Sequence, residues 1–373
     1  MSIKKVLVLS PSLKTLGGIQ SYTRSLVGGL TELLGADCVR VVTVPAEPKA
    51  RPDGSAALTR YVKLKFLLLA FRSAFVWRPD LVICTHLGTA PAARLIQTFT
   101  GIRYWLVLHG IEVWGNLPPA KERALRGAQR YLVLTRFTLD ATVKRHALGE
   151  RDYFLLPPPL ASAPVHSECE DLFAPSDVGR PIVLTVGRLA VSEQYKGHDV
   201  MLQAWPAVLR RVPDAVYWIV GDGDDRDRLE SFAQELGIAD SVRFAGTLSG
   251  ANLNACYEAC SVFAMPARTE LRPAVPRGEG FGIVFLEAMA HGKPVVAPRF
   301  GAPAEFIRPG EHGLLVDPED SVEIAEALVS LLEDPPRARQ MGVTARDFVA
   351  REFSNETFRA RLGGALQEGS ASD

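Results

Sequence analysis

The sequence predicts an α/β protein made of two Rossmann-like domains, each built on a doubly wound parallel sheet. The first indication is length, because 373 residues exceed what one ordinary compact core accommodates. The second is a repeated alternation of short apolar runs with segments of helical periodicity, which is typical of a parallel sheet covered by helices. The third is a stretch rich in Pro, Ser, Asp and Glu that interrupts this alternation before it starts again. We therefore predict an N-terminal domain over 1–160, a linker over 161–180 and a C-terminal domain over 181–350, facing a central cleft.

The N-terminal domain opens with a buried strand over 5–10, followed by the glycines Gly17 and Gly18 and an apolar-periodic helix over 19–34. The same alternation continues through the rest of the domain. Further strands are predicted over 39–44, 81–84, 104–108 and 131–134. A last helix, over about 354–367, is expected to cross back over this domain.

The C-terminal domain repeats the alternation with short elements. Strands are predicted over 181–186, 216–220, 242–244, 261–265, 294–297 and 314–316. Helices are predicted over 199–211, 225–236, 252–259, 281–291 and 322–333.

Composition excludes several function classes. Basic and acidic residues balance at 42 each, so no overall field attracts nucleic acid. The five cysteines are scattered, odd in number and without the paired spacing of a zinc site, which favours a reducing compartment. The first apolar run, Val6 to Leu9, is too short for a signal peptide or a membrane span, so we expect a cytoplasmic protein.

Two cations in a predicted strand-to-helix loop suit a diphosphate. Arg188 and Lys196 stand eight positions apart, at the carboxyl edge where open α/β sheets bind ligands. A guanidinium donates two parallel hydrogen bonds to phosphate oxygens, and an ammonium supplies a point charge. Together they suit a leaving pyrophosphate that gains negative charge as a bond breaks, although either residue alone is typical of a solvated surface.

Two glutamates flank a glycine pair. Glu279 and Glu287 have seven residues between them, one before and one on a predicted helix, around Gly280, Phe281 and Gly282. Glycine lets backbone amides and a helix N-terminus approach a phosphate, and carboxylates accept hydrogen bonds from sugar hydroxyls. The alternative is structural, namely helix capping and a solvated face.

Asp222-Gly223-Asp224 has the form of a metal-binding Asp-x-Asp motif, but its context favours a turn. It follows the predicted strand over 216–220, and Asp224 and Asp225 suit the start of a helix. We therefore predict no metal and no cofactor, because the cationic pair can neutralise a diphosphate by itself.

These motifs, taken in order, resemble the retaining glycosyltransferases of family 4, which have the GT-B fold. The resemblance covers nearly the whole chain and is most specific over 183–320. It is carried by Gly17-Gly18, His109, Val186-Gly187-Arg188-Leu189, Lys196-Gly197, the segment 279–287 and Leu314-Leu315-Val316-Asp317-Pro318.

The resemblance implies a role for each matching residue. Arg188 and Lys196, with Gly187, would hold the donor diphosphate. Glu279 would bind donor-sugar hydroxyls beside the amides of Phe281 and Gly282, and Glu287 would bind the ribose. Gly17 and Gly18 would let the first loop approach the donor phosphate or the acceptor. His109 would face the anomeric centre, whereas His86 is interpreted as a structural hydrogen-bonding residue.

The resemblance also implies a reaction. A hexose would pass with retention from a nucleotide diphosphate sugar, of the GDP-mannose or UDP-glucose type, to a glycan, glycolipid or polyprenyl-linked acceptor in polysaccharide or glycoconjugate synthesis. No carboxylate has the context of an obligatory nucleophile, so we expect a same-face mechanism in which the leaving diphosphate accepts the acceptor's proton. Catalysis would then rest on Arg188, Lys196, His109 and Glu279.

Two segments lie outside these motifs. Residues 269–277 insert extra charged residues and prolines just before Glu279, either as a cover over the ligand or as an indifferent surface loop. Residues 60–78 carry basic residues around an apolar run, which suits either peripheral contact with the inner face of a membrane or a core helix with snorkelling ends.

Four other functions compete with this interpretation. A sugar-nucleotide epimerase on the same fold would need no acceptor, and a phosphorylase would need a cofactor-lysine context that we do not find. A non-catalytic nucleotide-sugar-binding protein would not need all of Arg188, Lys196, Glu279 and Glu287. A dinucleotide oxidoreductase is disfavoured because the loop over 11–18 lacks the three-glycine fingerprint.

Overall fold

The structure, a computed structural model, contains two compact units. It describes residues 3–13, 17–45, 60–149, 152–160, 177, 179–272 and 274–371. Unit 1 comprises Met1–Pro159 and Asn355–Asp373, and unit 2 comprises Leu160–Ser354. Of the predicted linker over 161–180, only residues 177, 179 and 180 lie within the described residues.

Unit 1 is built on a parallel sheet whose strand order is β2-β1-β3-β4-β5-β6. The strands are β1 (Val6–Ser10), β2 (Val39–Thr43), β3 (Leu81–Cys84), β4 (Arg103–Leu108), β5 (Arg130–Val133) and β6 (Asp152–Leu155). The first five coincide closely with the predicted strands, and the apolar runs of β1, β3, β4 and β5 are almost wholly buried, whereas the edge strand β2 is only partly buried. β6 was not predicted, since none of its residues is fully buried and its sequence has no clear apolar run.

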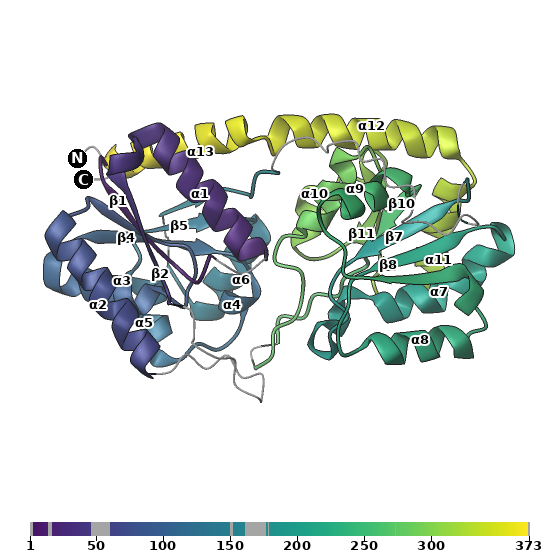
Figure 1. Cartoon of the computed structure of the whole chain (residues 1–373), viewed down its shortest axis with the longest axis horizontal. Helices are drawn as coiled ribbons and strands as arrows, with labels where there is room; N and C mark the ends of the chain where they lie inside the picture. Colours follow the sequence, from purple (N-terminus) through teal and green to yellow (C-terminus); the bar gives the residue numbers. More distant parts are fainter. Residues whose placement is uncertain are drawn as a thin grey trace. The chain divides into compact units, whose positions relative to one another are not determined.

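Helices cover both faces of this sheet. They are α1 (Gly18–Leu34), α2 (Arg60–Trp77), α3 (Ala90–Thr100), α4 (Ile111–Trp114), α5 (Pro119–Gly127), α6 (Arg136–His146) and α13 (Asn355–Ala371). α2, α3 and α5 lie on one face, whereas α1 and α13 pack together on the other (Figure 1). The last helix is held by the buried Arg130, which donates to the Ala365 carbonyl at 2.6 Å, and by Phe358, whose ring meets Tyr22 edge-on.

Unit 2 repeats this architecture with the strand order β12-β11-β10-β7-β8-β9. Its strands are β7 (Ile182–Val186), β8 (Val216–Val220), β9 (Val242–Gly246), β10 (Val262–Ala264), β11 (Val295–Pro298) and β12 (Gly313–Val316). Every pairing in both sheets is parallel, so the carboxyl ends of the strands in each sheet share one edge. The predicted fold class is therefore confirmed.

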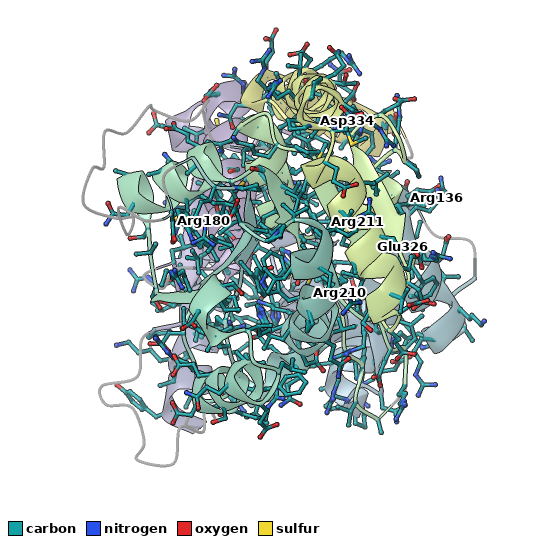
Figure 2. The ribbon with its side chains drawn as sticks, turned by 90° about the vertical axis from the view of Figure 1, so that its right-hand side faces the viewer. Arg136, Arg180, Arg210, Arg211, Glu326 and Asp334 are labelled. Carbon is teal, nitrogen blue, oxygen red and sulfur yellow. The ribbon has the colours of Figure 1, made fainter. Side chains whose placement is uncertain are left out.

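The helices of unit 2 are α7 (His198–Arg211), α8 (Arg226–Glu235), α9 (Gly250–Ala259), α10 (Ile283–Ala290), α11 (Ser321–Leu332) and α12 (Pro335–Glu352). α7, α8 and α11 cover one face of the sheet, and α9, α10 and α12 cover the other (Figure 1). The outward sides of α7 and α11 carry exposed charges, among them Arg210, Arg211 and Glu326 (Figure 2). α12 was not predicted, because polar residues interrupt its buried positions.

No helix that the structure describes combines the length and the apolar character needed to cross a bilayer.

Candidate functional site

Arg188 and Lys196 lie where the sequence predicts them, in the connection between β7 and α7 at the carboxyl edge of the unit 2 sheet. Their positions are linked by Glu193, which belongs to a short 3-10 helix over Val191–Lys196. Lys196 Nζ lies 2.9 Å from Glu193 Oε2, and the Arg188 guanidinium pairs with the other oxygen of the same carboxylate. One carboxylate therefore holds both cations together.

Gly187 lies directly beneath the Lys196 side chain. A Cβ atom added at Gly187 would come within 3.1 Å of Lys196 Cδ and 3.3 Å of its Nζ. A methyl group here would displace the flexible Lys196 side chain by a few tenths of an ångström, so glycine permits the present close approach. Gly187, Arg188 and Lys196 thus place an uncovered backbone, a guanidinium and an ammonium at one sheet edge.

Glu279 lies close to these cations. Burial raises the pKa of its carboxyl, while the charge of Lys196 lowers it, Glu193 raises it and Arg188 lowers it. The side chains of Lys196, Glu193 and Arg188 are thus near enough to influence the titration of Glu279. Its buried Oε2 has no hydrogen-bond partner among the residues that the structure describes. An acceptor atom left without a donor in a polar site is suited to a ligand hydroxyl.

Glu193 and Tyr195 belong to this site, and sequence reasoning missed both. The pKa of the Tyr195 hydroxyl is raised by burial and by the nearby charges of Glu279 and Glu193. Tyr195 also accepts the Arg268 amide through its backbone carbonyl at 2.6 Å. The one signal in the sequence was the i,i+3 spacing of Glu193 and Lys196, which places acid and base together only if that segment is helical.

The glycines after Glu279 shape the start of α10. Gly282 is the N-cap with φ of +89°, a backbone conformation that side chains rarely adopt, and an added Cβ would lie 2.8 Å from Phe285. The N-cap glycine has no side chain to cap this helix, so the first amides, other than that of Phe285, which donates to the Gly282 carbonyl at 3.0 Å, suit a ligand. Phe281 stacks on Phe306 with ring centroids 5.0 Å apart, which anchors the segment that also contains Gly280.

Glu287 lies on α10 and is oriented by a tyrosine. Tyr257 of α9 donates its hydroxyl to Glu287 Oε2 at 2.7 Å, and the ring of His291 stacks on Tyr257. Burial raises the pKa of Glu287, and the Tyr257 hydroxyl acts in the opposite direction. The second carboxylate oxygen is left for a ligand.

Removing this hydroxyl should weaken both the fold and the site. Tyr257→Phe is expected to destabilise unit 2 by about 1.5–3 kcal/mol, the range for a hydrogen bond to a charged group, and to weaken the binding of any ligand that Glu287 contacts. Tyr217→Phe is the matched control, because the Tyr217 hydroxyl bonds Thr185 at 2.9 Å on the opposite face of the same sheet. Thermal unfolding and ligand titration of both variants check this; equal ligand affinities would show that Tyr257 does not orient Glu287.

His109 directly follows β4 in unit 1, and its ring is nearly buried. Its Nε2 lies 2.7 Å from the Thr85 carbonyl, and its backbone amide donates to Glu112 Oε1 at 2.7 Å. Burial lowers the pKa of the ring to about 4, so the imidazole is neutral at pH 7. Neutral imidazole suits hydrogen bonding to hydroxyl groups rather than charge pairing.

Gly17 and Gly18 stand at the beginning of α1, which carries Tyr22 one turn later. The Tyr22 ring meets His109 edge-on, with centroids 5.3 Å apart, so the glycine loop and His109 belong to one region of unit 1. Residues 14–16 of this loop lie outside the described residues. The structure thus gathers Gly187, Arg188, Lys196 and Glu279 in unit 2, with Glu287 further along α10, and Gly17, Gly18 and His109 in unit 1.

The acidic turn after β8 stands at the start of α8, as the sequence predicts, and its side chains contact neighbouring loops. Asp225 is the N-cap of α8, but its side chain makes no capping bond and instead accepts from Arg228 at 2.6 Å and Gln194 at 2.9 Å. Asp224 accepts the Val191 amide. Among the described residues, no group of three or more His, Cys, Asp or Glu side chains is placed to hold a metal.

The insertion over 269–277 closes on itself just before Glu279. Glu270 and Arg277 exchange backbone hydrogen bonds of 2.8 and 2.9 Å, and Arg272 pairs with the Glu270 side chain. Pro273, in the middle of this loop, lies outside the described residues.

Comparisons with known proteins agree with this architecture. Residues 171–348 match the family described as glycosyl transferases group 1. The chain is 41% identical to a GDP-mannose-dependent alpha-(1-6)-phosphatidylinositol monomannoside mannosyltransferase of Mycolicibacterium smegmatis, over 94% of each chain. It is 38% identical to the enzyme of the same name from Mycobacterium tuberculosis, again over 94% of each.

Among solved structures, sucrose-phosphate synthase from Thermosynechococcus elongatus matches with a TM-score of 0.80 and 22% identity, covering 99% of this chain and 100% of that one. This likeness concerns the fold. The two relatives, at 41% and 38% identity over 94% of both chains, establish that the chain belongs to the glycosyl transferases group 1 family and is a glycosyltransferase, and the structural likeness agrees with its GT-B fold.

Proposed function

We propose that the protein is a retaining, metal-independent mannosyltransferase that moves mannose from GDP-mannose to a glycolipid acceptor. The observation that carries this proposal is 41% identity, over 94% of both chains, to a relative named for that donor and for a phosphatidylinositol monomannoside acceptor. The cluster of Arg188, Lys196 and Glu279 supports it, because these residues meet the needs of a sugar diphosphate. The relatives named above are both mannosyltransferases, which gives the epimerase alternative no support.

In this proposal unit 2 binds the donor. Arg188 and Lys196 exchange their contact with Glu193 for the diphosphate, and the amides at the start of α10 add further donors. Glu279 accepts hydrogen bonds from mannose hydroxyls through its unpartnered oxygen. Glu287, oriented by Tyr257, accepts from the ribose hydroxyls.

The reaction exchanges one bond for another on the same face of the sugar. The bond between the anomeric carbon and the diphosphate oxygen breaks, a bond forms between that carbon and an acceptor hydroxyl oxygen, and the hydroxyl proton passes to the departing diphosphate. Arg188 and Lys196 stabilise the charge that develops on the diphosphate, so neither a metal nor a protein base is required. His109 is proposed to contact the reacting sugar as a neutral imidazole.

The first test measures donor choice. GDP-mannose, UDP-glucose and ADP-glucose are offered to the purified protein, with phosphatidylinositol monomannoside as the acceptor and EDTA present throughout. We expect GDP-mannose alone to raise Tm and to yield a product whose new linkage has the α configuration of the donor. Stabilisation without transfer or hydrolysis would favour a non-catalytic binding protein, and a β-linked product would overturn retention.

We further propose that α2 contacts an anionic membrane that carries the acceptor. One side of this helix is buried through Val62, Phe66, Ala70 and Ala74. Its outer side exposes large apolar residues beside lysines and arginine, a combination that suits an interfacial helix. The exposed residues are Tyr61, Lys63, Leu64, Lys65, Leu68, Leu69, Arg72, Phe75 and Val76.

Polar replacement of this outer side should release the protein from vesicles. Leu64→Ser with Leu68→Ser is expected to reduce binding to vesicles containing phosphatidylinositol by about tenfold, since each leucine loses roughly 1.5–3 kcal/mol of burial when fully inserted and less when shallow. Val322→Ser in unit 2 is the control, because Val322 is equally exposed but lies outside α2. Co-sedimentation measures the effect, and unchanged binding of the double variant would refute the contact.

A further inference from the structure

Two histidines follow neighbouring strands of the unit 1 sheet. His109 comes directly after β4, and His86 comes two residues after β3, the strand that pairs with β4. Their rings lie 6.5 Å apart between centroids and are tilted by 35°. Each ring has one nitrogen bound to the backbone, and these bonds determine what the other nitrogen offers to a ligand.

The backbone partner of His109 is an acceptor. Since the Thr85 carbonyl cannot donate, the nitrogen facing it, Nε2, must bear the proton. The ring is neutral, because burial lowers its pKa to about 4. Nδ1 of His109 therefore presents a lone pair and accepts a hydrogen bond.

The backbone partner of His86 is a donor, so the other nitrogen of this ring offers a ligand a donor instead of an acceptor. The Gly88 amide donates to His86 Nδ1 at 2.9 Å, which requires a lone pair on Nδ1. Burial lowers the pKa of this ring, Glu112 raises it, and His109 and Lys121 lower it, so the neutral form prevails at pH 7. The proton is then on Nε2, and Nε2–H has no partner among the described residues.

Two hydroxyl side chains also lie at the carboxyl ends of neighbouring strands at this sheet edge. Ser10 ends β1 and Thr85 follows β3, and both side chains are almost completely buried. Their hydroxyl oxygens have no hydrogen-bond partner within the described ranges. One imidazole acceptor and one imidazole donor at the same sheet edge match the hydroxyl groups of a polyhydroxylated molecule.

We propose that His86 binds the carbohydrate substrate directly, its Nε2–H donating a hydrogen bond to a sugar hydroxyl while its Nδ1 holds the turn at Gly88. Two hydrogen bonds of about 2.8 Å that meet at one oxygen join nitrogens about 4.6 Å apart at a tetrahedral angle, and at most about 5.6 Å apart. The ring separation is compatible with one hydroxyl bound by His86 as donor and by His109 as acceptor. This inference rests on the proposed function, for which it names one substrate contact.

Two substitutions separate the binding role from the structural role. Asn places its carbonyl oxygen near the position of Nδ1, so His86→Asn keeps the acceptor for Gly88 and removes the donor. Gln reaches the position of Nε2 with its amide, so His86→Gln keeps the donor and gives up the turn contact. Kinetics with GDP-mannose and phosphatidylinositol monomannoside, together with Tm, are measured for both variants and the wild type.

We expect His86→Asn to keep the wild-type Tm and to lose about tenfold in kcat/KM, the effect of one neutral hydrogen bond. His86→Gln should have a lower Tm and retain activity within about threefold. A raised KM for the acceptor assigns the hydroxyl to the acceptor, and a raised KM for GDP-mannose assigns it to the donor sugar. Wild-type kinetics in His86→Asn would overturn the proposal and leave His86 a purely structural residue.

One measurement does not depend on turnover. Long-range ¹H–¹⁵N spectra of the imidazole nitrogens report which nitrogen of His86 is protonated, and a proton on Nδ1 would overturn the assignment. If wild-type protein neither transfers nor hydrolyses any sugar nucleotide, the proposed function fails, and the spectra still decide the tautomer.

Discussion

Lys196→Ala should lower kcat by about 100- to 1,000-fold, the effect of removing one pre-positioned group that stabilises developing charge. Lys196 is held over Gly187 by Glu193, so its ammonium is positioned before any ligand arrives. Without it, the diphosphate leaves with one cation fewer, and Glu193 faces Arg188 alone. Single-turnover kinetics with GDP-mannose and GDP-induced changes in Tm measure the two effects separately.

Lys293→Ala is the matched control for this variant. Lys293 also belongs to unit 2 and donates a hydrogen bond, to the Glu258 carbonyl at 2.7 Å, but it precedes β11 at the amino edge of the sheet. Its loss should leave GDP binding and kcat unchanged. If Lys196→Ala retained wild-type kcat, the proposed role of the pair Arg188 and Lys196 in leaving-group stabilisation would be wrong.

Gly187→Ala offers an independent comparison within the same site. Its methyl group would press on the Lys196 side chain without removing any charge. A variant that keeps both cations but loses much of the activity would show that position, and not charge alone, accounts for the effect of Lys196→Ala.

The fold was predictable because buried parallel strands are continuous apolar runs. The strands over Leu81–Cys84 and Val216–Val220 coincide with their predicted bounds, and their residues are buried on both faces of the sheet. Elements without such runs were missed. β6 is only partly buried. α12 begins with two prolines, which are typical of a helix end in the sequence, although proline is well tolerated in the first turn of a helix.

The residues of the candidate site were partly predictable, for a different reason. Arg188, Lys196 and Glu279 combine charge types and spacing that suit a diphosphate and a sugar, and they resemble a known family. Glu193 and Tyr195 could not be found in this way, because their place in the site depends on a 3-10 turn that periodicity does not reveal. The free donor of His86 is likewise a property of one backbone contact, from Gly88.

Glu279→Gln should lower kcat/KM by roughly 10- to 150-fold, the equivalent of the 1.5–3 kcal/mol assigned to a hydrogen bond with a charged partner. The amide keeps the size of the side chain and one acceptor oxygen but loses the negative charge that strengthens bonds from sugar hydroxyls. In the wild type, protonation has the same effect. Because burial raises the pKa of Glu279 above its ordinary value of 4.5, kcat/KM should fall as the pH is lowered through that raised pKa.

The same substitution should make the protein more stable at neutral pH. A carboxyl whose pKa is raised in the folded state binds its proton more tightly there than in the unfolded chain. Stability is therefore lost as the pH rises from 4.5 through the folded pKa, and above this window the wild type carries the full cost of a buried charge. Glu279→Gln has no such cost, so its Tm should exceed that of the wild type at pH 8 and converge with it near pH 4.

Glu326→Gln separates this effect from a general change in charge. Glu326 is exposed on α11, so its neutralisation should leave both Tm and kcat/KM unchanged at each pH (Figure 2). A higher Tm together with lower activity in Glu279→Gln alone would identify Glu279 as a residue kept charged for ligand binding at the expense of the fold. Equal Tm values for Glu279→Gln and the wild type at pH 8 would show that Lys196 and Arg188 already compensate its burial.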